Sequence, residues 1–275
     1  MPTREQLLEE LHLLPQWQRR GRPGLGAAAA ARGAPVAAPV ESVTGAPASV
    51  PSPAPRQPPI AIPGRLAPAD ADAGGDDADS RRRARIAALE WPDFAADVAA
   101  CTACGLCRTR NRTVPGVGDA NADWLFIGEA PGAEEDARGE PFVGQAGRLL
   151  DNMFAALGLA RGRKVYVANV LKCRPPGNRA PEPAEVDACR PYLDRQIALI
   201  RPKLVVALGR SAAMTLLGSD ATISSLRGRV HRFGDLPLVV TYHPAYLLRT
   251  LPDKAKAWED LLLARRTMAE MGGES

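Results

Sequence analysis

Residues 124–132 read Trp-Leu-Phe-Ile-Gly-Glu-Ala-Pro-Gly, and this stretch decides how we interpret the chain. The apolar run Trp124–Ile127 predicts a short buried strand. The Gly/Pro-rich turn that follows carries Glu129, with Glu134-Glu135-Asp136 close behind. Because the carboxyl ends of strands in α/β domains open onto the ligand crevice, this turn predicts a reactive site.

Strand and helix patterns alternate on both sides of that stretch. Further strands are predicted at residues 164–168 and 204–208, a hairpin at 230–233 and 236–241, and helices at 85–100, 144–157, 184–200, 211–217 and 254–268. Alternation of this kind predicts a mostly parallel sheet between two layers of helices. The expected fold class is therefore a three-layer α/β/α domain.

Composition divides the chain into three parts. Residues 1–20 contain a leucine stripe at helical spacing, which predicts an amphipathic helix that could dock on a replication or repair protein. Residues 21–80 are dominated by Ala, Pro and Gly and then by aspartates. Such a segment buries too little apolar surface to fold, so a disordered linker is expected. Residues 81–275 are expected to form the folded domain.

Charge and cysteine usage limit the class of protein. A net charge of +4 permits a polyanionic partner without requiring one. We expect no membrane association, because the sequence has no apolar run long enough to span a bilayer. The odd, clustered set of five cysteines and the absence of a secretory pattern favour a reducing, cytoplasmic location over disulfides. A monomer is expected.

The cysteines are arranged as a candidate metal or cluster site. Cys101-x-x-Cys104 supplies two thiols on a tight turn, and Cys173 and Cys189 follow further along the chain. Four converging thiolates bind either a structural zinc or an iron–sulfur cluster. Cys107 extends the first pair to a C-x-x-C-x-x-C run, so spacing alone leaves open both the metal and the identity of the four ligands.

Several motifs in a fixed order carry a family resemblance. After the first cysteine pair and the Gly-Glu-Ala-Pro-Gly turn come Pro141-Phe142-Val143-Gly144, then residues 169–176 (Asn-Val-Leu-Lys-Cys-Arg-Pro-Pro), then residues 243–248 (His-Pro-Ala-Tyr-Leu-Leu). Over residues 97–268 the chain resembles the family 4 uracil-DNA glycosylases. The resemblance implies a four-stranded parallel sheet, a [4Fe–4S] cluster and excision of uracil from DNA. It implies the ligands Cys101, Cys104, Cys173 and Cys189, and it leaves Cys107 outside that set.

The chemistry of uracil excision indicates which residues would recognise the base. The nucleotide must swing out of the duplex into a pocket before its sugar carbon can be attacked. Phe142 fits the aromatic floor of that pocket, and Ala130 is expected to contact the substrate beside it. The carboxamide of Asn169 can accept from uracil N3–H and donate to O4, a pattern that cytosine reverses. His243 fits the donor to the developing charge on O2.

The remaining roles fall to carboxylates, an apolar wedge and arginines. We expect Glu129 to position water near the sugar, and Glu135 to form a pocket wall near the reaction. Leu247 is expected to wedge into the base stack. Arg249 and Arg227-Gly228-Arg229 would then contact phosphates.

Two other functions remain open. One is a non-catalytic DNA-binding module that holds a cluster or zinc. The other is a glycosylase for other deaminated bases, such as hypoxanthine.

Overall fold

A computed structural model of the chain describes residues 73–272. The expected helix of residues 1–20 and most of the expected linker lie outside the described residues. Residues 73–80, which we assigned to the linker, instead belong to helix α2 (Ala73–Ala87). The linker boundary at residue 80 is therefore wrong. The aspartates that indicated a linker form helical i,i+4 ion pairs, Asp77 with Arg81 and Asp79 with Arg83.

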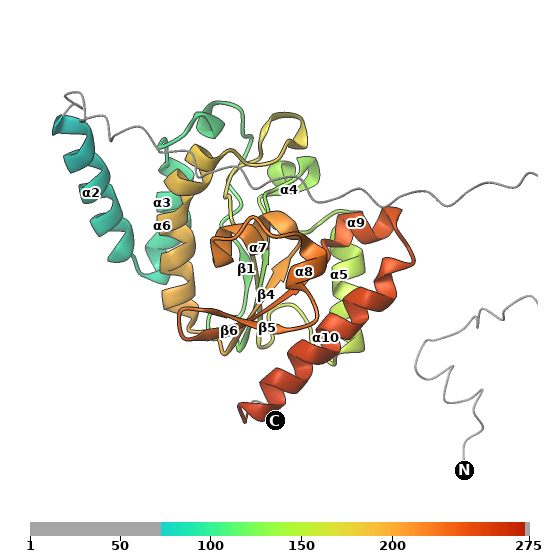
Figure 1. The fold of residues 1–275 in the computed structure, drawn as a ribbon. Helices are drawn as coiled ribbons and strands as arrows, with labels where there is room; N and C mark the ends of the chain where they lie inside the picture. The colour runs from blue at the N-terminus through green and yellow to red at the C-terminus, as the bar shows by residue number, and fades with distance from the viewer. Residues whose placement is uncertain (1–72, 273–275) are drawn as a thin grey trace, which may run out of the picture. The chain divides into compact units, whose positions relative to one another are not determined.

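The helix predicted over residues 85–100 is in fact two helices. α2 ends at Ala87, and α3 (Trp91–Ala100) begins beside Pro92, a residue suited to the first turn of a helix. Ile86 of α2 and Phe94 of α3 share an apolar cluster with Tyr192. Both helices lie against α6 (Pro183–Ile200), as Figure 1 shows.

A six-stranded sheet forms the centre of the described chain. Its four inner strands are parallel and lie in the order β3 (Val165–Asn169), β2 (Trp124–Gly128), β4 (Leu204–Leu208) and β6 (Leu236–Thr241). These confirm the expected parallel core. Antiparallel edge strands extend it on both sides: β1 (Val117–Gly118) pairs with β3, and β5 (Val230–Phe233) forms the predicted hairpin with β6.

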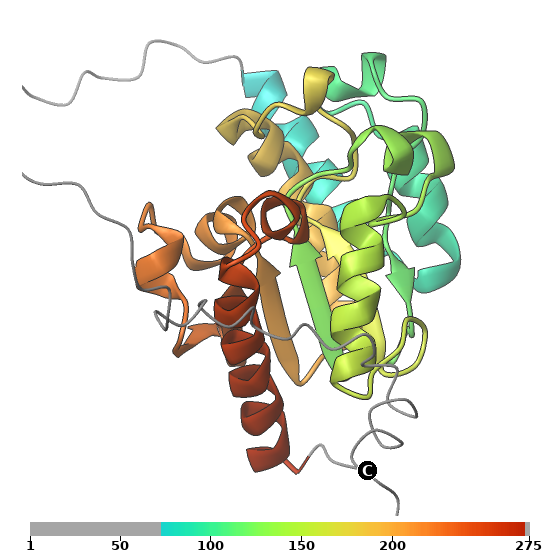
Figure 2. The same ribbon diagram turned by 90° about the vertical axis from the view of Figure 1, so that its right-hand side faces the viewer.

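Helices cover both faces of the sheet, which confirms the three-layer fold (Figures 1 and 2). Alternate strand residues point to opposite faces. Leu125 and Ile127 of β2 pack in one cluster with residues of α6, α7 (Arg210–Leu217) and α8 (Ile223–Leu226). Phe126 points the other way and packs with α5 (Gln145–Ala156) and α10 (Asp253–Glu270).

The carboxyl ends of the parallel strands gather the loops that carry the sequence motifs. Short elements occupy these and neighbouring loops: the 3₁₀ turns Gly105–Arg108 and Pro176–Asn178, and the helices α4 (Ala133–Arg138) and α9 (Pro244–Arg249). Because the inner strands run in one direction, the turn after β2, the end of β3 and the loop after β6 meet at the same edge of the sheet. None of the helices in residues 73–272 is long and apolar enough to cross a membrane.

Candidate active site

A cavity of about 460 Å³ lies at this edge of the sheet. Its size falls within the range of small-molecule sites, about 300–1,000 Å³. Six of the seven residues that we expected in the catalytic and substrate-binding set line it: Glu129, Ala130, Glu135, Phe142, Asn169 and His243. The structure therefore brings together side chains that are up to 114 positions apart in sequence, from residue 129 to residue 243.

Glu135 braces the cavity wall through main-chain hydrogen bonds. One carboxylate oxygen accepts from Gly132 N at 3.1 Å, so the side chain satisfies a free main-chain donor at the start of α4. The other accepts from Val143 N at 3.0 Å and from Gly144 N at 3.3 Å. The side chain thus ties the turn after β2 to the loop that carries Phe142.

Phe142 lies under the cavity in a constrained backbone conformation. Its φ of 55° is in the left-handed region, which is uncommon for a bulky residue. Arg161 Nη2 donates to Phe142 O at 2.7 Å, and Gly147 of α5 approaches that carbonyl so closely that a Cβ there would lie 1.6 Å from the oxygen. The phenyl ring stacks on the His243 imidazole, with centroids 5.5 Å apart and planes at 28°.

Asn169 presents a polar atom that no described residue satisfies. The residue ends β3 and is 2% exposed. Its Oδ1 has no hydrogen-bond partner among the residues that the structure describes, and buried polar atoms in proteins are rarely left in that state. Gly128 permits this placement, because a Cβ on it would lie 2.4 Å from Oδ1. The carboxamide is therefore available to a ligand in the cavity.

His243 is held as a neutral ring with its proton on Nε2. Burial lowers the pKa of His243 to about 4, and the positive charge of Arg249 acts in the same direction. The ring caps α9, where Nδ1 accepts a hydrogen bond from Ala245 N at 3.1 Å. Because Nδ1 is the acceptor, the single proton of the neutral imidazole must be on Nε2. The ring is a hydrogen-bond donor to the cavity.

Glu129 is a half-buried carboxylate that lines the cavity. Burial raises its pKa, and a hydrogen bond from the Ser211 side chain partly offsets that effect. Its carbonyl accepts from Leu171 N at 3.1 Å, so the turn after β2 is fixed against the chain that follows β3.

Arg179 and Tyr246 also line the cavity, and neither was expected there. Tyr246 belongs to the His-Pro-Ala-Tyr motif and could have been inferred from it. Arg179 comes from the Pro-rich loop, and its sequence context gave no such indication.

Leu247 does not occupy the position that we expected. It is 1% exposed and packs with Tyr242 and Ala257 beneath α9, so it cannot reach a base stack in this conformation. Its neighbour Leu248 is 41% exposed. The expectation for Leu247 is wrong. Packing against the rest of the fold decides which face of the six-residue helix α9 points inward, and the position of Leu247 relative to His243 in the sequence does not.

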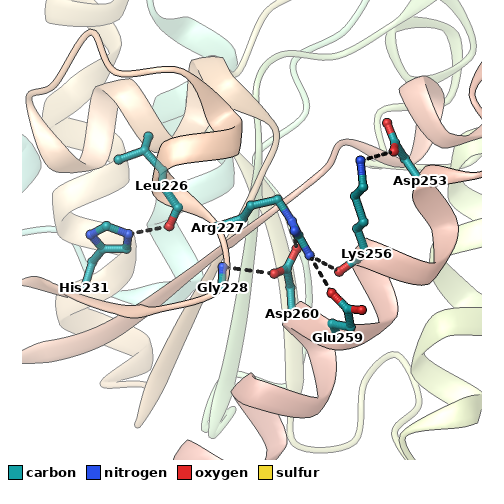
Figure 3. A network of polar contacts seen from close by, with 8 residues as sticks. All are labelled: Leu226, Arg227, Gly228, His231, Asp253, Lys256, Glu259 and Asp260. Carbon is teal, nitrogen blue, oxygen red and sulfur yellow. Dashed lines mark hydrogen bonds and ion pairs between the residues drawn. The ribbon is translucent and has the colours of Figure 1, made fainter.

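Arg227 is also not available for phosphate. Figure 3 shows it between the segment after α8 and helix α10, where its Nε donates to Asp260 Oδ2 at 3.0 Å. The Asp260 side chain is fully buried and also accepts from Gly228 N at 3.1 Å. Arg227 therefore neutralises a buried carboxylate and anchors α10 beside the hairpin.

The four expected cysteine ligands line a second, smaller cavity. Cys101 and Cys104 come from the segment after α3, Cys173 from the loop after β3, and Cys189 from α6; Cys107 does not line it. Basic residues donate to two of the sulfurs: Arg110 Nη1 to Cys173 at 3.1 Å, and Arg82 Nη2 to Cys101 at 3.6 Å. Within residues 73–272 no group of His, Cys, Asp or Glu side chains is arranged to hold a single metal ion.

Comparison with known proteins identifies the family. The uracil DNA glycosylase superfamily matches residues 115–262. A type-4 uracil-DNA glycosylase of Archaeoglobus fulgidus is 46% identical over 164 residues, which cover 57% of this chain and 82% of that protein. One of Thermotoga maritima is 40% identical over 176 residues, 62% of this chain and 91% of that protein. A type-5 uracil-DNA glycosylase of Pyrobaculum aerophilum is 34% identical over 155 residues, 50% of this chain and 67% of that protein.

The fold and the matched region define a class of DNA-repair proteins. The chain belongs to the uracil DNA glycosylase superfamily and, by its identity to relatives that it covers for more than four fifths of their length, to the type-4 uracil-DNA glycosylases. The resemblance noted in the sequence is thereby confirmed.

Proposed function

We propose that this chain excises uracil from DNA by hydrolysing the N-glycosidic bond of a flipped-out deoxyuridine, and so starts base excision repair. The observation that carries the proposal is the unsatisfied Oδ1 of Asn169 in a cavity that also presents the Nε2–H donor of His243. Uracil is the complement of that pair, because it offers a donor at N3 and an acceptor at O2.

Base recognition uses Phe142 and Asn169. Base–aromatic stacking on Phe142 contributes about 1–3 kcal/mol and does not depend on which base is present. Selection comes from Asn169, whose Oδ1 accepts from uracil N3–H while Nδ2 donates to O4. Cytosine has an acceptor at N3 and a donor at its exocyclic amine, so it leaves both atoms of the carboxamide unsatisfied at a cost of about 1–3 kcal/mol for each buried group.

Bond cleavage uses His243 and Glu129. As the bond breaks, negative charge develops on uracil O2, and Nε2–H of His243 stabilises it; one such preorganised donor is worth about 3 kcal/mol in other enzymes. The neutral ring does this without transferring a proton. The carboxylate of Glu129, oriented by Ser211, positions water and stabilises the positive charge that develops on the sugar.

The rate of uracil excision is expected to fall once as the pH is lowered, because Glu129 becomes protonated. Its pKa is raised, so activity falls as the pH drops through a value above that of an ordinary glutamate. His243 adds no inflection near pH 6.5, because its pKa is about 4 and the ring is already neutral there. Single-turnover rates between pH 4.5 and 8.5 test this: in Glu129→Gln this fall should vanish and the rate should be low at every pH. An inflection near 6.5 in that variant would contradict the assignment.

Gly128→Ala is expected to damage the cavity selectively. The new Cβ would lie 2.4 Å from Asn169 Oδ1 and 2.6 Å from Phe142 Cζ, so both base-binding side chains must shift. A displacement of about 1 Å can lower a rate about 100-fold. Gly105→Ala is the matched control, since nothing lies within 4 Å of the added atom and its rate should match the wild type. Equal rates in both variants would exclude the close packing described here.

DNA contacts are proposed for α9. Leu248 is its exposed apolar side chain, suited to fill the gap left by a flipped base, and Arg249 lines the cavity where it can contact a phosphate.

A [4Fe–4S] cluster is proposed for the second cavity, held by Cys101, Cys104, Cys173 and Cys189. The donor set supports it: four thiols face one space, and Arg82 and Arg110 supply hydrogen bonds of the kind that stabilise sulfur-bound negative charge. When bound, the cluster would crosslink the segment after α3, the loop after β3 and α6. We propose this bracing as its role.

Arg110→Met is expected to weaken cluster retention without removing a ligand. It deletes the bond to Cys173 Sγ and two bonds from Nη2 to the carbonyls of Ala99 and Cys101. Iron and sulfide per chain, and the decay of visible absorption in air, measure retention; a roughly 10-fold faster decay is expected, in line with the effect of other outer-shell changes. Arg174→Met is the control, since Arg174 bonds the Asn178 side chain instead of a sulfur. A colourless wild-type protein that contains zinc would overturn the cluster.

The function is tested with oligonucleotides that contain one uracil, hypoxanthine or thymine, incubated with the chain and cleaved with alkali. Cleavage at uracil alone is expected. Cleavage at hypoxanthine would assign the enzyme to another deaminated base, and binding without cleavage would indicate a non-catalytic module.

A further inference from the structure

Lys172 is a buried cation next to the base-binding residue. It is 1% exposed, and its ammonium donates to Asn169 O at 2.8 Å and to Gln196 Oε1 at 2.6 Å. Among its contacts with the described residues there is no carboxylate. Burying an ammonium group is costly unless it is well hydrogen-bonded, so the fold keeps this residue at some expense to stability.

The partner of Lys172 is itself rigidly held. Gln196 of α6 is fully buried, and its Nε2 donates to Pro115 O at 2.6 Å and to the Tyr166 hydroxyl at 3.1 Å. The space around it is filled, because a Cβ on Gly116 would lie 2.8 Å from Nε2. Gln196 therefore gives the ammonium a second fixed partner in addition to the Asn169 carbonyl.

The main chain of Lys172 connects to the cysteine cavity. Its N–H donates to Cys189 Sγ at 3.3 Å, its carbonyl accepts from Val114 N at 2.8 Å, and Cys173 is the next residue. One residue thus contacts both the proposed cluster ligands and the main chain of the proposed base reader.

The direction in which the Asn169 carboxamide points depends on the main chain of that residue. No described group holds Oδ1, so the side chain is oriented only by the backbone that carries it and by the packing around it. The neighbouring residues are fixed, since Val170 N and Leu171 N donate to Gly128 O and Glu129 O at 3.0 and 3.1 Å. The Asn169 carbonyl is fixed by Lys172.

We propose that Lys172 is a positioning residue for base selection. Its main chain is bonded to Cys189 and its ammonium to Gln196, and through that ammonium it holds the Asn169 carbonyl and so sets the direction in which the carboxamide points at the flipped base. This inference rests on the proposed function. Lys172 does not touch the substrate, so its effect on uracil excision must pass through Asn169.

A double-mutant cycle tests this route. Single-turnover excision of uracil is measured for the wild type, Lys172→Met, Asn169→Ala and the double variant, each with its iron and sulfide content. Lys172→Met should lower the rate about 30- to 100-fold, the scale of a small misplacement of a reacting group. In the Asn169→Ala background it should lower the rate less than about 3-fold, because coupled residues are not additive. Lys203 is half-exposed and paired with Asp123, so the control variant Lys203→Met should change the excision rate in neither background.

A second variant is used in case Lys172→Met loses the cluster or fails to fold. Gln196→Met removes the other anchor of the ammonium, and within the described residues none of the hydrogen bonds of the Gln196 side chain goes to a cysteine: they join Lys172, Pro115 and Tyr166. This variant should show the same dependence on Asn169 with a smaller effect. The proposal would be overturned if a variant that keeps its iron lowers the excision rate by the same factor in the wild-type and Asn169→Ala backgrounds. A residue with a merely structural role would act independently of Asn169. A wild-type chain that leaves uracil in place would instead overturn the proposed function.

Discussion

His243→Ala is expected to lower the single-turnover rate of uracil excision about 100- to 1,000-fold, while affinity for the DNA stays within about 3-fold of the wild type. The ring is neutral, with its proton on Nε2, so what the variant loses is a preorganised donor to the charge that develops on O2. That charge is larger in the transition state than in the bound substrate, and the loss therefore appears in the rate rather than in binding.

His231→Ala is the matched control. His231 lies on β5, and its Nε2 contacts the carbonyl of Leu226 at 2.6 Å, as Figure 3 shows. It does not line the cavity. The excision rate of His231→Ala should match that of the wild type. If the two histidine variants had equal rates, or if His243→Ala lost DNA affinity instead of rate, O2 stabilisation would not be the role of His243.

Asn169→Ala is expected to lower uracil excision about 100-fold. Two hydrogen bonds to the base are removed, each worth about 1–1.5 kcal/mol, and 1.4 kcal/mol corresponds to a factor of 10. Unlike the loss of His243, this change weakens the bound state of the flipped base as well as the transition state, so inhibition by free uracil should also weaken. Rates and inhibition constants measured on one duplex separate the two effects.

Asn152→Ala serves as the control for that variant, because Asn152 is exposed on α5. It should leave both quantities unchanged. An Asn169→Ala enzyme that is still inhibited by free uracil as strongly as the wild type would show that the carboxamide does not read the base, whatever its rate.

The parallel core could be predicted because its strands are short, continuous apolar runs and its helices have clear periods. Leu204–Leu208 was located to the residue, and the predicted bounds of α5 and α6 differ by one residue at most. Six of the seven expected catalytic and substrate-binding residues share the cavity because a motif at the end of a parallel strand has only one edge of the sheet to occupy.

The failures depend on packing between distant segments, which sequence patterns do not encode. Leu247 and Leu248 are adjacent and identical in type, and only the contact with Tyr242 and Ala257 decides which one is buried. Arg227 was expected to contact phosphates, but α10 places Asp260 beside it. The linker boundary was wrong because ion pairs stabilise a helix whose composition is poor in apolar residues.

The role proposed for Lys172 also depends on contacts between distant segments that could not be predicted from the sequence. In the sequence this lysine is one basic residue of a motif, and nothing there relates it to Gln196, 24 positions later. Its contact with Asn169 O is local, but its burial and its anchoring arise from α6 and the residues before β1.

The most direct test is to identify the base released from one duplex oligonucleotide that contains uracil, cytosine, thymine and hypoxanthine at separate positions. Mass spectrometry of the free bases and of the remaining strand measures all four outcomes at once. We expect free uracil, one abasic site at the uracil position and retention of the other three bases. Release of hypoxanthine or thymine in place of uracil, or a strand that remains intact while the protein binds it, would contradict this expectation.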